Sequence, residues 1–246
     1  MARNTRRKVR RRGRRKKRGF ASWSLGKKIG AVFGGTFLAV AVIGMVILAS
    51  KMNKLKSVKL NTDKLNISDE VQHEEGYTNV ALFGLDSREN DLGKGNRSDT
   101  IMIASLNNDT KEVKLVSIYR DTLLELDDGS YNKANAAYAF GGPEGAVSLI
   151  NRNLDMNIEK YVTVNFNALV DVIDAVGGLD LELTHDEVVH MNNYCVETSK
   201  VTGKDYEKIE PEVEGTYHLN GVQAVSFSRI RYTEGGDFTR AERQRL

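Results

Sequence analysis

One stretch of the chain is apolar without interruption over the length of a lipid bilayer. Residues 29–49 are 21 consecutive uncharged residues, rich in Val, Ala, Gly, Phe and Ile. As a helix they would extend about 31 Å at ~1.5 Å per residue, which matches the hydrocarbon core of a membrane. The stretch has no polar face, as a buried core helix would have, and it is too long for a signal-peptide core. We therefore expect a transmembrane helix here, with the lipid bilayer as a partner.

The chain after residue 76 alternates between strand-like and helix-like patterns. Apolar runs and alternation predict strands at 80–85, 101–106, 113–118, 161–166, 179–183 and 227–232. Helical spacing and boundary residues predict helices from Gly142-Pro143-Glu144 to about Asn153, over 169–176, over 220–225, and from about Asp237 onward. Helices and strands alternate irregularly, so we expect an α/β fold, a three-layer α/β/α sandwich with a mixed central sheet.

Charge separates the beginning of the chain from the rest. Residues 1–28 hold 14 of the 36 Lys and Arg residues and none of the 33 Asp and Glu, so the remainder, 22 basic against 33 acidic, is net −11. A basic arm can bind nucleic acid or anionic lipid, and the apolar stretch beside it favours lipid. Basic flanks stay cytoplasmic. We expect a cytoplasmic tail at 1–28, a stalk at 50–76, an extracytoplasmic catalytic domain at 77–246, and no nucleic-acid partner.

Cysteine and histidine give no sign of a transition-metal site. Cys195 is the single cysteine, so it can form no internal disulfide and no Cys-based zinc site. None of the four histidines is paired at a ligand spacing. The segment 187–214, which contains Cys195, matches no motif and is interpreted as an insertion or a loop.

Charged residues gather where the predicted strands between residues 79 and 122 begin or end. They are Asp86, Arg88, Arg97, Asp99, Arg120 and Asp121. Strand interiors favour Val, Ile and Phe, and ionised groups resist burial, so these residues suggest strand ends that open onto one site. Carboxylates suit a hard cation and guanidiniums suit phosphate oxygens. The pattern indicates a metal-assisted phosphate site, with surface salt bridges as the alternative.

A second charged group closes the chain. Arg229 and Arg231 stand two apart in the predicted strand at 227–232, which would place both on one face. Asp237, Arg240 and Gln244 are three and four apart, so a helix would carry them on one side. In the alternative interpretation Asp237 caps a helix and the arginines, above all Arg243 and Arg245, form a solvated face.

Several motifs in order give residues 77–246 a resemblance to the LytR-CpsA-Psr family of cell-envelope proteins. The matching pieces are Asn79-Val-Ala-Leu-Phe-Gly-Leu-Asp86, Arg97-Ser-Asp99-Thr100, Val116-Ser-Ile-Tyr-Arg120-Asp121-Thr122, Lys133-Ala-Asn135-Ala136, Ile173-Asp-Ala-Val-Gly-Gly178, Arg229-Ile-Arg231-Tyr232 and Asp237-Phe-Thr-Arg240-Ala-Glu-Arg243-Gln244. Members of the family are Gram-positive phosphotransferases. They move an anionic glycopolymer, such as teichoic acid or capsule, from a polyprenyl pyrophosphate carrier to peptidoglycan. The resemblance implies the same activity here.

The resemblance also assigns roles to individual residues. Asp86 and Asp99 match carboxylates that hold Mg²⁺, with Mn²⁺ as the alternative. The pyrophosphate group is expected against Arg97, Arg120, Arg229, Arg231, Arg240 and Gln244. Arg88, Asp121 and Asp237 lie beside these motifs, and either Asp121 or Asp237 is expected to accept the hydroxyl proton. The helices at 144–153 and 168–176 are expected to line a tunnel for the lipid.

Three points remain open at this stage. The family domain normally continues past Leu246 with further helices, so we expect the chain to be a fragment or a truncated gene product. A polyprenyl-pyrophosphate hydrolase, with water as the acceptor, is one alternative function. A transcriptional attenuator with a DNA-binding tail is another, and the adjacent apolar stretch and the acidic body argue against it.

Overall fold

The computed structural model describes residues 57–68, 76–87 and 91–246. Residues 59–246 form one compact unit. The predicted tail, the predicted span, most of the predicted stalk and Arg88 lie outside the described residues. Within the described ranges, no helix is both long enough and apolar enough to cross a membrane.

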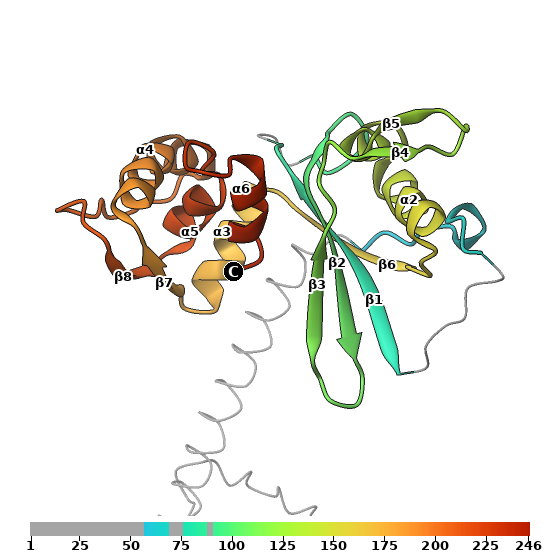
Figure 1. The fold of residues 1–246 in the computed structure, drawn as a ribbon, viewed down its shortest axis with the longest axis horizontal. Helices are drawn as coiled ribbons and strands as arrows, with labels where there is room; N and C mark the ends of the chain where they lie inside the picture. Colours follow the sequence, from blue (N-terminus) through green and yellow to red (C-terminus); the bar gives the residue numbers. More distant parts are fainter. Residues whose placement is uncertain (1–56, 69–75, 88–90) are drawn as a thin grey trace, which may run out of the picture. The chain divides into compact units, whose positions relative to one another are not determined.

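A four-stranded mixed sheet is the centre of the fold (Figure 1). Its order is β3 (Val113–Ser117), β2 (Ser98–Asn107), β1 (Tyr77–Leu85) and β6 (Lys160–Val164). β1 pairs antiparallel with β2 and parallel with β6, and β2 pairs antiparallel with β3. The predicted mixed sheet and α/β class are confirmed, and so are the four strands predicted in this region.

Helix α2 (Ala134–Leu154) packs against one face of the sheet (Figure 1). Phe83 of β1 meets Tyr138 edge to face at 5.3 Å, inside a core that also contains Ile101 and Ile150. Gly142 has a φ of 67°, which interrupts the helix directly before Pro143. The predicted helix from Gly142-Pro143-Glu144 is therefore the second part of α2, and the first part was not predicted.

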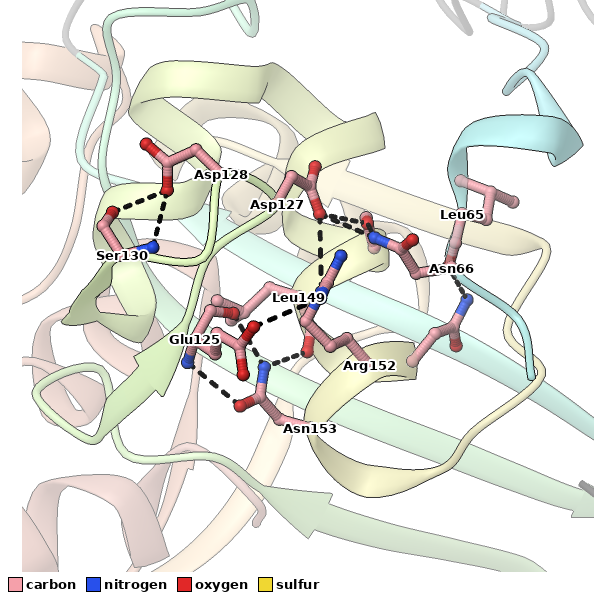
Figure 2. A network of polar contacts seen from close by, with 11 residues as sticks. Leu65, Asn66, Glu125, Asp127, Asp128, Ser130, Leu149, Arg152 and Asn153 are labelled. Carbon is pink, nitrogen blue, oxygen red and sulfur yellow. Dashed lines mark hydrogen bonds and ion pairs between the residues drawn. The ribbon is translucent and has the colours of Figure 1, made fainter.

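A polar network fastens the opposite side of α2 to the chain around it (Figure 2). The Asn66 amide donates to Asp127 at 2.8 Å and to Ser148 at 2.6 Å, while Arg152 reaches Glu125 at 3.3 Å. The network joins the short 3₁₀ helix η2 (Thr62–Lys64) and the hairpin β4 (Leu123–Glu125)–β5 (Tyr131–Lys133) to α2. The segment leading into the sheet is thereby held against its core.

A second cluster of buried residues lies among α3 (Phe166–Ala175), α4 (His185–Thr202), α5 (Gly221–Ser228) and the hairpin β7 (Leu179–Leu183)–β8 (Gly215–Leu219). The predictions of α3, β7 and α5 are confirmed. The loop predicted at 187–214 is wrong over its first part, which is α4, and Cys195 is buried in it. Thr184 and Glu187 form a capping box at its start, a signal present in the sequence.

The strand predicted at 227–232 is also wrong. Helix α5 continues to Ser228, the bends that follow belong to no strand, and helix α6 (Asp237–Arg243) begins where it was predicted. Asn220 caps α5 with Gln223, and this box sets the helical register of the residues after it. Phe227 and Ile230 are buried three apart, as helical spacing allows, and not because they alternate in a sheet. Arg229 and Arg231 therefore share no strand face.

Candidate active site

Three arginines converge on the Asp99 carboxylate. Arg120 donates to Oδ1 at 2.9 Å, and Arg240 and Arg231 lie 3.4 Å and 3.6 Å from Oδ2. Asp237 lies 3.6 Å from Arg231 and 3.9 Å from Arg240. Residues from β2, from the chain after β3 and from the end of the chain thus form one cluster. The prediction that the two charged motifs meet is confirmed for these residues.

Local irregularities place the members of this cluster. Leu85 of β1 pairs with Ser98 and Gly84 pairs with Thr100, so Asp99 has no partner across the sheet. An extra residue of this kind is a β-bulge, which redirects a side chain. Near the end of the chain, Gly235 and Gly236 have φ values of 86° and 52°, in the left-handed region that glycine adopts readily. They form the turn that leads into α6.

Arg120, Arg231 and Arg240 are partly buried, and they share the carboxylates of Asp99 and Asp237. Burial acts to lower the pKa of Arg120, but the charge of Asp99 and the hydrogen bond to it outweigh burial and raise that pKa. Burial, followed by repulsion from Arg231, lowers the pKa of Arg240 despite the attraction of Asp99. The side chain of Arg240 is 9% exposed, and its Nε has no hydrogen-bond partner among the described residues. Such a group is prepared to bind an anion.

An apolar pocket of about 590 Å³ opens beside the cluster. Its walls come from the second face of the sheet and from α3, β7 and α5, and they include Leu82, Val162, Val164, Leu169, Ile173, Leu181 and Val225. Asp86, Asp99, Arg229, Arg231, Arg240 and Gln244 also line it. The predicted contribution of 168–176 to an apolar cavity is confirmed. That of 144–153 is wrong, because α2 packs on the other face of the sheet.

The remaining predicted residues are spread around this pocket. Arg229 binds Glu197 at 2.8 Å and Thr198 at 3.0 Å, and its guanidinium lies 4.7 Å from the ring centre of Phe166. It contributes to the pocket wall and not to the Asp99 cluster. Asp86 is exposed at the end of β1. Arg97 is exposed and lines neither this pocket nor the second one described below.

Arg243 is buried, so the solvated position predicted for it is wrong. Its side chain is 4% exposed, and it binds Glu187 at 2.8 Å, the Ile230 carbonyl at 3.2 Å and the Thr233 hydroxyl at 2.6 Å. The cause is the first turn of α4, a helix that the sequence did not predict, which brings Glu187 to α6. Arg243 therefore fastens the helix that carries Arg240.

A second pocket, of about 330 Å³, touches the same cluster from the chain after β3 and from α6. Tyr119 and Phe238 line it with their rings edge to face, 4.9 Å apart. Asp121 also lines it and pairs with Lys133 at 2.6 Å. The hydrogen bond from Lys133 and the charge of Arg120 lower the pKa of Asp121, and together they outweigh burial, which acts to raise it. Sequence reasoning missed Tyr119, Lys133 and Phe238 as site residues, although each stands beside a charged motif.

The carboxylates of this site are ligands of the type that binds a magnesium ion. Mg²⁺ is usually held by one or two carboxylates together with substrate phosphates. Asp86 and Asp99 line the same pocket and supply two carboxylates. Among the described residues no group of three or more His, Cys, Asp or Glu side chains could hold a metal by itself. A cation here would therefore depend on oxygen atoms of the substrate.

Known proteins share the sequence motifs and the fold of this chain. A family model described as LytR_cpsA_psr family matches residues 42–246. The polyisoprenyl-teichoic acid–peptidoglycan teichoic acid transferase TagU of Bacillus cereus (strain AH820) is 34% identical over 91% of this chain and 67% of that protein. TagU of Enterococcus faecalis (strain ATCC 700802 / V583) is 32% identical over 90% and 69%. The solved structure titled "TagT bound to LI-WTA" has a TM-score of 0.59 and 25% identity, over 77% of this chain and 69% of that one.

Proposed function

This chain belongs to the LytR_cpsA_psr family, and on that premise we propose that it transfers an anionic glycopolymer from a polyprenyl pyrophosphate carrier to peptidoglycan. The observation that carries the proposal is the convergence of Arg120, Arg231 and Arg240 on Asp99 at the edge of an apolar pocket. An amphiphile with a diphosphate head and a lipid tail has the complementary chemistry. The names of the TagU relatives, which are polyisoprenyl-teichoic acid–peptidoglycan transferases, support the same substrates.

The arginines bind and polarise the diphosphate in this proposal. Their planar forks donate to phosphate oxygens in pairs, and they stabilise negative charge that grows as the phosphoryl group is transferred. Arg240 contributes most, because it is the most deeply buried of the three and its Nε has no hydrogen-bond partner in the described part of the chain. Gln244, one turn after Arg240, lines the same pocket and donates to the head group.

A proton and a cation complete the chemistry. Asp86 and Asp99 would hold Mg²⁺, which supplies charge neutralisation at the diphosphate. Asp237 is the better candidate to accept the proton of the attacking hydroxyl. The alternative, Asp121, is held by Lys133 and Arg120, and its lowered pKa makes it a weaker base.

The apolar residues 29–49 would anchor the enzyme in the cell membrane, with the tail cytoplasmic and the catalytic part outside. A carrier lipid is confined to the membrane, so an anchored enzyme would meet its donor at the bilayer surface. Labelling of a Thr5→Cys variant, made in a Cys195→Ser background, by an impermeant maleimide on intact cells tests the topology. Labelling before lysis would contradict it.

Reconstituted transfer tests the proposed function. The full chain in detergent micelles is mixed with Mg²⁺, a polyprenyl-pyrophosphate-linked teichoic acid and a soluble peptidoglycan oligosaccharide, and the polymer-linked oligosaccharide is measured. We expect Arg240→Lys, which keeps the charge and loses the fork, to lower kcat/KM roughly 10²-fold. Arg152→Lys, the same change on α2 away from both pockets, is the control and should match wild type. Release of free polymer without linkage would identify a hydrolase instead.

A further inference from the structure

The second pocket and the apolar pocket meet at a few residues of the arginine cluster and diverge from there. Asp99, Thr100, Arg240 and Gln244 line both, and the two pockets have no other lining residue in common. The apolar pocket extends between the sheet, α3 and α5, whereas the second pocket extends between the chain after β3 and α6. Two ligands can therefore reach the same cluster from different directions.

The lining of the second pocket differs in chemistry from that of the first. Tyr119 is 43% exposed and Phe238 is 65% exposed, so two aromatic rings present open faces or edges at its rim. Thr122 supplies a hydroxyl, and Asp121 and Asp237 supply carboxylates beside them. Aromatic faces offer a rigid apolar surface, and hydroxyls and carboxylates hydrogen-bond to neighbouring hydroxyls. This combination suits a sugar ring, which has apolar C–H faces and a polar edge.

Phosphoryl transfer fixes the direction from which the acceptor must approach. The attacking and leaving oxygens lie roughly in line, on opposite sides of the phosphorus. The leaving group is polyprenyl phosphate, whose tail the apolar pocket accommodates. The attacking hydroxyl therefore has to arrive from another direction, and the second pocket provides one.

We propose that the second pocket is the acceptor subsite, in which Tyr119 and Phe238 hold a pyranose ring of the peptidoglycan glycan strand. The proposal rests on the function proposed above. The sugar oxygen bonds to the phosphorus next to the polymer, and the bond from that phosphorus to the bridging oxygen breaks. Polyprenyl phosphate leaves with the electron pair, and the hydroxyl proton passes to Asp237, which lines this pocket.

The first sugar of the donor polymer is the competing occupant. The carboxylates of Asp121 and Asp237 are 45% and 56% exposed at the second pocket. A phosphate-rich polymer would be repelled by exposed carboxylates at close range. The acceptor ring contributes hydroxyl groups to the same place, for which carboxylates are good partners.

Kinetics with two varied substrates test the proposal. The full chain in micelles is assayed with the donor and the soluble peptidoglycan oligosaccharide described above, for wild type, Tyr119→Ala, Phe238→Ala and Phe238→Leu. Loss of a stacking ring should raise the acceptor KM roughly tenfold and leave the donor KM within about twofold. Phe238→Leu keeps apolar volume without a ring, so it separates stacking from folding. Phe140→Ala, which removes a ring 63% exposed on α2, is the control and should match wild type.

Direct binding separates this proposal from the proposed function. Saturation-transfer NMR with the oligosaccharide alone needs no donor and no transfer, and we expect a signal with wild type that Phe238→Ala and Phe238→Leu lose. Binding of this kind without any transfer would support the subsite and refute the transferase. Transfer with unchanged acceptor KM and unchanged binding in all three variants would refute the subsite and leave the transferase standing. A rise in the donor KM alone would assign the pocket to the donor sugar and overturn the proposal.

Discussion

Replacing Arg243 by alanine should lower the free energy of unfolding more than the same replacement of the neighbouring Arg245. The substitution removes a guanidinium that is 4% exposed and that binds Glu187, Thr233 and the Ile230 carbonyl. It also leaves the Glu187 carboxylate, 16% exposed, without its cation. Breaking a buried pair on one side costs about 3–5 kcal/mol. Because the Thr184 amide and hydroxyl still donate to Glu187, we expect the lower end, about 3 kcal/mol.

Urea unfolding followed by circular dichroism measures this loss, provided the slope m stays constant. Arg245→Ala is the matched control two residues away, since the Arg245 side chain makes one described hydrogen bond, to Ser117 at 3.0 Å. It should cost about 1 kcal/mol or less. A similar free-energy loss in the two variants would refute the assignment of Arg243 as a buried structural residue.

The Arg243–Glu187 pair also predicts how the stability of the protein changes with pH. Burial alone would raise the pKa of Glu187, but hydrogen bonds from Thr184 and Arg243 outweigh burial and lower that pKa in the folded protein. A lowered carboxylate pKa adds stability above the unfolded value, about 4.3, and that stability is lost as the pH falls through the folded pKa. The stability difference between wild type and Glu187→Gln should therefore be full above about pH 5 and shrink below about pH 4.3. A difference independent of pH from 7 to 3 would contradict this reasoning.

Three further predictions concern other parts of the molecule. Asn151→Ala should cost about 3 kcal/mol in the same urea assay, since this buried amide bonds Leu65 and both backbone groups of Ile158, whereas Asn193→Ala on the exposed side of α4 should cost about 0.5 kcal/mol or less. Cys195 should resist iodoacetamide at pH 8 until the protein unfolds, because burial raises the pKa of its thiol to about 11; rapid alkylation of the folded protein would contradict this. Asp86→Ala and Asp99→Ala should each abolish Mg²⁺-dependent transfer, and full activity of either would remove that residue from the proposed cation site.

Sequence periodicity was sufficient where one face of an element is buried against a neighbour close in the chain. Strands β1 and β2 alternate between the α2 core and the apolar pocket, and α3 ends at Ala175, one residue before its predicted end. Periodicity failed for residues 227–232, because Ile230 and Tyr232 are two apart, as in a strand, whereas Phe227 and Ile230 are three apart, as in a helix. The Asn220–Gln223 capping box distinguishes the two, and it lies upstream of the stretch in question.

The site was predicted in composition more successfully than in arrangement. Charged motifs far apart in the sequence indicated one phosphate site, and Arg120, Arg231 and Arg240 do meet at Asp99. No local pattern indicated that Arg229 would turn instead to Glu197, since that pairing depends on how α4 packs against α5. The burial of Arg243 has the same origin. Long-range partners decide which member of an arginine-rich motif binds a ligand and which binds the protein.

Regular elements of the fold therefore form the apolar walls of the site, and irregular segments position its charged groups. Strand and helix surfaces build the apolar walls, because continuous backbone pairing leaves side chains as the only contact groups. The charged groups come from interruptions: the bulge at Asp99, the turn that carries Arg120, and the glycine turn before α6. Where regular backbone pairing is interrupted, a side chain can point in a direction that the alternation of a regular strand does not allow. The turn that carries Arg120 and the glycine turn before α6 bring guanidiniums to the Asp99 carboxylate at the bulge. This carboxylate keeps the guanidiniums together before a ligand arrives, so a diphosphate binds donors already in place.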